Sequence, residues 1–297
     1  MNLLHEIITS PWFIERHYAD QHIPLVLRMI RGDYLLGGEV KSEPPQPDEK
    51  FRNHKIAFIN SGKPYTVDAI DVAWYSDEIE EPSLFILNCN GPISKYDQFC
   101  GPDGTKTKSL LLQRADNHPK IFAHLINIDS GGGSGYAARN LGETISKLQK
   151  PVFAFIDDYG ASAAYWIASA ASHIAAGSNM ARVGSIGTYL SIADYTEYFK
   201  NEGIRIVDVY AKASSDKNQD YIKAIAGDLS LVQQLADQFN DFFLNQVKTS
   251  RKGKLTSSDW NSGKMYFAPE AIELGLIDDI MTFDEYVEEI FKEFSPK

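Results

Sequence analysis

The chain of 297 residues lacks the features that mark several protein classes. It has two cysteines, Cys89 and Cys100, and their spacing fits neither a metal site nor a disulfide framework. Its 29 basic residues are outnumbered by 40 acidic ones, so the formal net charge is −11, which opposes binding to nucleic acid or anionic lipid. We therefore expect two free thiols in a reducing compartment, no metal, no cofactor and no nucleic-acid partner.

A long apolar run is also missing. The least polar stretch, 161–177, consists mainly of Ala and Ser and is interrupted by His173, so it falls short of the ~20 apolar residues of a membrane span. The first sixteen residues contain Glu6 and Glu15 and have no basic flank followed by an apolar core, so no signal peptide is expected. The sequence thus predicts a soluble, cytoplasmic protein without a membrane anchor.

Three regions follow one another along the chain. Apolar residues recur at helical spacing before Gly37 and Gly38, which predicts a short helical N-terminal extension over 1–38. Charges and prolines predict a linker and lead-in segment over 39–82. In 83–297, β-like runs alternate with helical patterns, which indicates one large α/β domain with a largely parallel sheet.

The hydrophobic patterns place the elements of this domain. Strands are expected at residues 84–89, 122–128, 152–156, 173–176 and 206–210. Helices are expected at residues 108–117, 136–148, 161–172, 192–202 and 229–249. The last helix is amphipathic, and its apolar face is expected to pack on the core.

A run of glycines follows the strand that ends near residue 128. The sequence Asp-Ser-Gly-Gly-Gly over 129–133 lets backbone amides approach a ligand closely, so it could cradle an anion or an oxyanion. It is not a P-loop, because no Gly-Lys-Ser/Thr follows. A merely flexible strand-to-helix turn is an equal alternative.

Ser162 stands at the next strand-to-helix junction. Its neighbours are small, and the amide of Ala163 follows it, which is the arrangement that acyl transfer requires of a serine nucleophile and an oxyanion donor. A helix N-cap is the structural alternative for this serine.

A serine nucleophile also needs a base. Only His173 follows Ser162 among the seven histidines, and its apolar strand pattern is typical of a hydrogen-bonded core histidine. A lysine with a lowered pKa can serve instead.

Seven segments together resemble the signal peptide peptidase (SppA-like) family of serine peptidases, which belongs to the ClpP/crotonase superfamily. They lie in family order at residues 84–91, 129–133, 159–169, 183–188, 212–217, 263–271 and 275–278. The resemblance implies a ClpP/crotonase-like fold of repeated ββα units.

The same resemblance implies a Ser-Lys dyad. Ser162 would attack the scissile carbonyl, Lys217 would accept its proton, and Ser185 would orient the lysine amine. Gly132 and Ala163 would donate the amides of the oxyanion hole. Gly131 stands where the family has proline, and Ser214 where it has glycine, so Lys217 is preferred to Lys212 on spacing.

The N-terminal pattern at 10–14 and 23–30 resembles the leader of lambda-type head maturation proteases. This branch implies scaffold or capsid proteins as substrates, a homo-oligomeric ring, and a location in the bacterial host cell or the phage prohead. Two alternatives stay open: a catalytically silent assembly component of the same fold, and a crotonase-like acyl-CoA enzyme.

Overall fold

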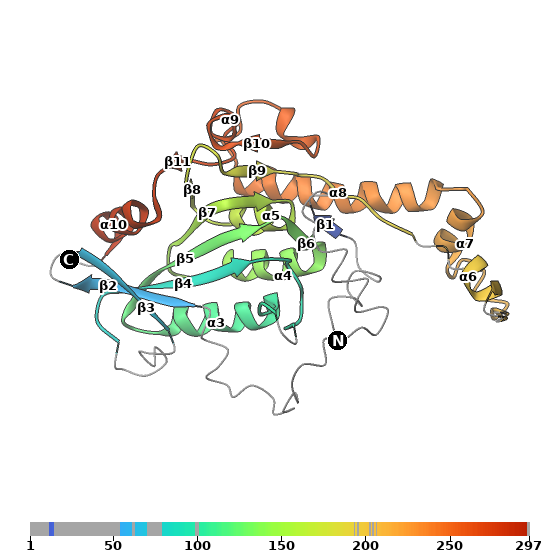
Figure 1. Cartoon of the computed structure of the whole chain (residues 1–297), viewed down its shortest axis with the longest axis horizontal. Helices are drawn as coiled ribbons and strands as arrows, with labels where there is room; N and C mark the ends of the chain where they lie inside the picture. Colours follow the sequence, from blue (N-terminus) through green and yellow to red (C-terminus); the bar gives the residue numbers. More distant parts are fainter. Residues whose placement is uncertain are drawn as a thin grey trace.

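The structure is a computed structural model (Figure 1). It describes residues 12–14, 54–60, 63–69, 79–98, 101–192, 194, 196–201, 203, 205 and 207–295. A nine-stranded sheet runs through its centre, and a protruding helical segment extends to one side.

Parallel strands form the middle of the sheet. They are β4 (Ser83–Asn90), β5 (Ile121–Ser130), β7 (Val152–Ala161), β8 (His173–Ala176), β9 (Arg182–Gly184) and the short β11 (Asp279–Ile280). β7 is shared: its first half pairs with β8 and its last residues pair with β9. Most residues of β4, β5 and β7 are buried, as expected for strands covered on both faces.

Antiparallel strands close the two edges. The hairpin of β2 (Lys55–Asn60) and β3 (Lys63–Asp68) adds to β4, and β10 (Met265–Phe267) adds to β9. This hairpin lies within the segment predicted to be a linker and lead-in, and it extends the sheet by two strands.

Helices cover both faces of the sheet. One face packs against α3 (Thr105–Asn117), α4 (Gly135–Ile145), α5 (Ala163–Ser169) and the C-terminal part of α8 (Ser230–Ser250). The other face packs against α10 (Phe283–Phe294). The strand period decides which core each side chain joins: Phe85 and Leu87 point to the first face, and Leu84 and Ile86 to the second.

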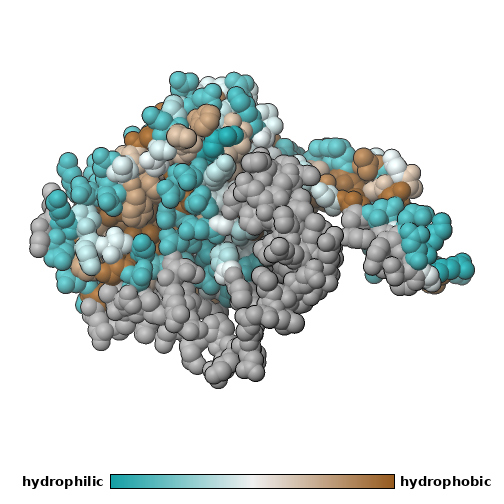
Figure 2. All heavy atoms as spheres, in the orientation of Figure 1, coloured by the Kyte–Doolittle hydropathy of each residue, from teal (hydrophilic) through white to brown (hydrophobic). Residues whose placement is uncertain are grey.

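An arm projects from this body. We use this name for the described residues from α6 (Thr196–Asn201) through α7 (Gln219–Ile225) to the N-terminal half of α8, with the connections between these helices (Figure 1). α8 is anchored at its other half, where the ring of Phe243 stacks on that of Trp166 with centroids 5.1 Å apart. Hydrophobic atoms lie exposed on the arm over α8 (Figure 2). Farther along α8, next to Phe243, the side chain of Phe242 is 64% exposed.

The predicted fold class is confirmed. ββα units recur along the chain, the sheet is largely parallel, and four of the five expected strands are present. The strand expected at 206–210 is wrong over its described part, because residues 207–210 form no strand. Val207 and Val209 are exposed on the arm, so their alternating pattern has no sheet to bury against.

The N-terminal prediction is largely outside the described residues. Within 1–38 only β1 (Trp12–Ile14) is described, and it is a strand. The predicted domain boundaries therefore stay predictions. No helix in the described part of the chain is long and apolar enough to span a membrane. Cys89 is a free, buried thiol, and Cys100 lies outside the described residues.

Candidate active site

Ser162 occupies a strained position at the junction of β7 and α5. Its φ is +56° and its ψ is −120°, a backbone conformation that residues other than glycine rarely adopt. Two bonds hold it there: the Ser162 N–H donates to the carbonyl of Gly184 at 2.8 Å, and the Ser162 carbonyl accepts from the Trp166 N–H at 3.0 Å. Such strain persists only where the surrounding structure imposes it, and it is concentrated at functional sites.

The glycine loop lies directly beside this serine. β5 and β7 are parallel with Ser130 opposite Gly160, so Gly132 and Ser162 each follow a paired residue by two positions. The N–H of Gly132 donates to the hydroxyl of Ser130 at 3.1 Å, and that hydroxyl donates to the Gly91 carbonyl at 2.6 Å. The predicted oxyanion donor is thus next to the serine, with its amide engaged by Ser130.

Sequence reasoning did not assign a role to Ser130. It is fully buried, and it ties the glycine loop to the end of β4. The only available signal was its place within the Asp-Ser-Gly-Gly-Gly run, which does not distinguish a hydroxyl that shapes the loop from one in a solvent-exposed turn.

Ala163 and Ser185 also lie at this junction. Ala163 is the first residue of α5, so its N–H has no partner within the helix, and it is fully buried. Ser185 follows Gly184, which is paired with Ala161, so Ser185 and Ser162 stand at neighbouring strand ends. Ser185 has a φ of +51°, and its N–H donates to the Lys264 carbonyl at 2.9 Å.

Lys217 is not part of this cluster. It is exposed, and its N–H donates at 3.3 Å to the carbonyl of Ser214 in the same loop. The helix α7 begins two residues later and lies on the arm, whereas α5 lies in the body (Figure 1). Within one chain, the structure brings Ser162, Gly132, Ala163 and Ser185 together and leaves Lys217 apart.

His173 is far from Ser162, as its structural interpretation requires. It is paired with Phe153, eight residues before Ala161 on β7, so about 26 Å of strand separates it from the serine. Its ring nitrogens contact the hydroxyl of Tyr286 at 2.9 Å and the carboxylate of Asp279 at 3.0 Å. The predicted hydrogen bonds of His173 are present, but its side chain is 30% exposed, so it lies at the edge of the core and not inside it.

Acidic groups surround the glycine loop. Burial raises the pKa of the Asp129 carboxyl, a hydrogen bond from the Tyr159 N–H partly offsets this, and the neighbouring carboxylates of Asp158 and Asp157 raise the pKa further. The carboxyl groups beside the loop offer no positive charge for the phosphates of an acyl-CoA.

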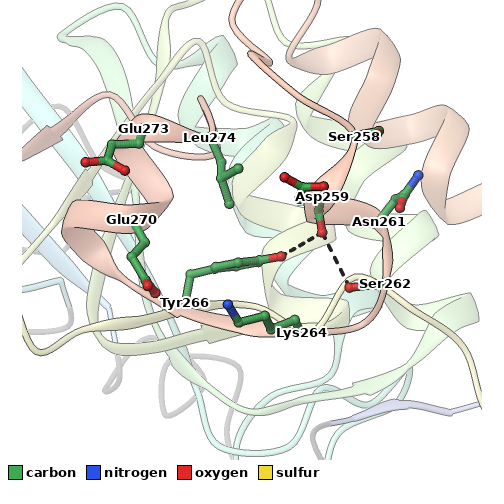
Figure 3. A pocket seen from close by; sticks show the side chains of 9 residues that line it. All are labelled: Ser258, Asp259, Asn261, Ser262, Lys264, Tyr266, Glu270, Glu273 and Leu274. Atoms are coloured by element: carbon green, nitrogen blue, oxygen red, sulfur yellow. Dashed lines mark hydrogen bonds between the residues drawn. The ribbon is translucent and has the colours of Figure 1, made fainter.

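A polar cleft of about 510 Å³ lies near the Ser185 turn (Figure 3). It is lined by Ser258, Asp259, Asn261, Ser262, Lys264, Tyr266, Glu270, Glu273 and Leu274. In it, the Tyr266 hydroxyl donates to the Asp259 carbonyl at 2.7 Å. None of the predicted site residues lines this cleft, and no cluster of three or more metal-ligating side chains occurs among the described residues.

A strained serine that follows a parallel strand, precedes a helix and adjoins a glycine-rich loop defines an α/β protein with a candidate site at the ends of its parallel strands. The model of peptidase family S49 matches residues 144–295, just over half of the chain. The chain therefore belongs to peptidase family S49, as its motifs predicted.

Known relatives include two proteases. Protease 4 of Haemophilus influenzae is 27% identical over 209 residues, which are 69% of this chain and 34% of that protein. Capsid assembly protease C of Escherichia phage lambda is 26% identical over 172 residues, which are 57% of this chain and 39% of that protein. This chain therefore aligns with well under half of either relative.

Among solved structures, the chain is similar to the 1510-N membrane-bound stomatin-specific protease. The identity is 14%, the TM-score is 0.46, and the alignment covers 70% of this chain and 84% of that one.

Proposed function

We propose that this chain is a serine endopeptidase in which Ser162 is the nucleophile. The observation that carries the proposal is the strained backbone of Ser162, held by two hydrogen bonds beside the glycine loop, in a chain of family S49. Ser162 Oγ would bond to the scissile carbonyl carbon while its proton passes to a lysine amine. The amine of the product would leave with that proton, and water would then hydrolyse the acyl-enzyme.

Two backbone amides would stabilise the oxyanion. The Ala163 N–H has no partner in its own helix, and the Gly132 N–H can exchange the Ser130 hydroxyl for a substrate oxygen. Each such donor contributes roughly 10²–10³ to the rate in related chemistry. Gly132 lies in the paired strand β6 and Ala163 begins the helix α5, so regular elements hold both amides.

Lys217 would act as the general base on the serine of a neighbouring copy. The distance along the arm keeps it from Ser162 of its own chain, and exposed apolar residues on the arm supply a surface for a second copy. These residues are Val207, Val209, Ile225 and Leu229. In a homo-oligomeric ring, docking of the arm would remove the lysine from water and bring it to Ser185, which would orient it.

The substrate would be a phage scaffold or capsid protein. The similarity to the capsid assembly protease of phage lambda supports this part of the proposal. The enzyme would then act in the bacterial cytoplasm or the prohead. The chemistry needs no metal and no cofactor.

Complementation between two inactive variants tests the dyad. Ser162→Ala and Lys217→Ala should each reduce cleavage of a protein substrate at least ~10³-fold, because each removes a reacting group. A mixture of the two should regain part of the activity, since a ring can pair an intact serine with an intact lysine. Lys212→Ala is the matched control and should retain activity within about twofold.

Two outcomes would contradict the proposal. Full activity of Lys217→Ala would remove that residue from the mechanism, and absence of recovery in the mixture would place the two groups in one chain. A fluorophosphonate probe separates the enzyme from a silent assembly component: it should label Ser162 in the assembled wild-type protein, and it should not label the Lys217→Ala variant.

A further inference from the structure

The glycine strand β6 (Gly132–Ser134) is paired on both of its edges. On one edge, the Ile93 N–H donates to the Gly132 carbonyl at 2.9 Å, and the Ser134 N–H donates to the Ile93 carbonyl at 2.8 Å. On the other edge, β1 (Trp12–Ile14) runs antiparallel to β6 (Figure 1). The chain's own N-terminal strand therefore covers the outer edge of the loop that is proposed to hold the oxyanion.

The alternation of backbone groups along a strand shows which residues of β6 face each edge. A strand residue points its N–H and its C=O to the same side, and successive residues alternate. Since Gly132 and Ser134 face Ile93, the N–H and C=O of Gly133 face β1. Phe13 is the residue opposite Gly133, so its own N–H and C=O are the groups that face β6.

No side chain could replace hydrogen at Gly133. A Cβ there would overlap the backbone of Ile93. β6 is thus pressed against the Ile93 segment, and β1 approaches it from the remaining side. The edge that β1 covers accepts an extended backbone without obstruction from a Gly133 side chain.

β1 lies at the candidate nucleophile. The helix α5, which starts directly after Ser162, is in contact with both β6 and β1. Trp12 is opposite Ser134 and Ile14 is opposite Gly132, so β1 runs towards the Ser130 end of the glycine loop. Ser162 itself is only 1% exposed, so a peptide carbonyl cannot reach its hydroxyl unless neighbouring groups move.

We propose that β1 is a built-in pseudosubstrate strand. It occupies the edge of β6 on which the backbone of a substrate, on the side preceding the scissile bond, would pair, and it must leave before a peptide can bind. The inference rests on the proposed function, because it takes the edge beside Ser162 to be the substrate edge.

Tethering explains why so short a strand can compete. A segment attached to the same chain acts at an effective concentration in the millimolar range, so it excludes weakly binding peptides without high intrinsic affinity. A three-residue strand has few ladder bonds, and a longer peptide that binds more of the edge can displace it. The strand would therefore select against short or weakly bound peptides.

Binding of the strand's own sequence to the full chain provides the test. The probe is a fluorescein-labelled peptide with the sequence of residues 10–18 (SPWFIERHY), and fluorescence anisotropy gives its Kd. All proteins carry Ser162→Ala, so that no cleavage interferes. Adding Phe13→Pro removes the N–H that faces Gly133, opens the edge, and should tighten peptide binding about tenfold or more.

Ile14→Pro is the matched control. It introduces the same ring one residue later, where the N–H points away from β6, and it leaves Phe13 in the extended region that the strand already uses. Peptide affinity should stay within about twofold of that of the parent. A peptide with proline at position 13 should not bind to any of the proteins.

Equal affinity in the Phe13→Pro variant and the parent would overturn the inference, as would equal tightening by both prolines or absence of binding by all three proteins. Unfolding midpoints that match the parent establish that the prolines have not disturbed the body. The binding readout is independent of catalysis, and cleavage is measured separately on chains that keep Ser162. If the Ser162→Ala proteins bind as expected but the chain with Ser162 cleaves nothing, the proposed function alone is refuted. If the chain with Ser162 cleaves but Phe13→Pro leaves peptide affinity unchanged, the pseudosubstrate alone is refuted.

Discussion

The two halves of the proposed dyad lie in regions of opposite character. Ser162 is buried, and hydrogen bonds to Gly184 and from Trp166 fix its strained backbone between β7, β9 and α5. Lys217 is exposed on the arm, and its N–H bonds only to Ser214 within the same loop. The sheet therefore holds the proposed nucleophile in place within one chain. The proposed base would gain a defined position only when the arm binds another copy of the chain.

If the body holds Ser162 in place, removal of the buried ion pair of the body should cause the largest loss in the free energy of unfolding. Arg251 is 1% exposed, donates to both oxygens of Asp278 at 2.8 and 3.0 Å, and also donates to the Gly275 carbonyl. Arg251→Met removes both bonds to the Gly275 carbonyl and leaves Asp278 with Lys254 and the Ile174 N–H as its donors, so the free energy of unfolding should fall by about 3–5 kcal/mol. Urea denaturation measures this, and a loss below about 1 kcal/mol would show that the pair does not brace the body.

Neighbouring residues of α8 sharpen the contrast within one helix. Phe243 is fully buried against Trp166, so Phe243→Ala should lower the free energy of unfolding by about 3 kcal/mol. Phe242→Ala should change it by less than about 0.5 kcal/mol at low protein concentration, since that ring is 64% exposed. Similar losses for the two variants would mean that the arm side of α8 is also packed.

Acid should weaken the body through Asp278. Burial alone would raise the pKa of this carboxyl, but hydrogen bonds from Arg251 and Lys254 outweigh it and lower the pKa to about 2. Because the folded pKa lies below the unfolded one, this stabilisation is complete above about pH 4 and is lost as the pH falls to 2. It amounts to roughly 2 kcal/mol. The stability gap between wild type and Asp278→Asn should therefore narrow over that range; a gap independent of pH would refute the assignment.

The smallest effect is expected on the arm. Lys217→Ala should leave the free energy of unfolding of the dilute chain within about 0.5 kcal/mol of wild type, because the side chain is exposed. The same variant is expected to abolish activity in the assembled enzyme. Chemical denaturation at low concentration checks the first statement, and a large loss there would mean that Lys217 has a structural role in the body.

Local patterns were sufficient for much of the fold. Continuous apolar runs predicted β4, β5, β7 and β8, and helical spacing predicted α8 from residue 229 to 249 against Ser230–Ser250 in the structure. These patterns wrongly predicted a strand at 207–210. An alternating pattern shows only that one side of a segment is apolar, and it does not show whether a sheet lies next to that side. Val209 is 89% exposed, and in this chain that side faces no sheet.

The site was predictable in part for the same reason. Small residues at strand-to-helix junctions made it possible to predict Ser162, Ala163 and Gly132 as candidates. These junctions lie side by side in the structure. Ser130 and the Arg251–Asp278 pair carried no comparable signal. The residue type alone does not reveal whether a hydroxyl or guanidinium group is buried, and the partners of these groups are far away in the sequence.

The α/β class, the family and the location of Ser162 at a strand-to-helix junction could be predicted from the sequence alone. These features depend on periodicity and on short motifs whose residues are neighbours in the chain. Only the tertiary structure decided that Gly184 and Trp166 hold Ser162 in its strained conformation, that Lys217 stands apart from it, and that β1 lies on the glycine strand. Those relations join residues far apart in sequence, and strand pairing and packing create them only once the chain has folded.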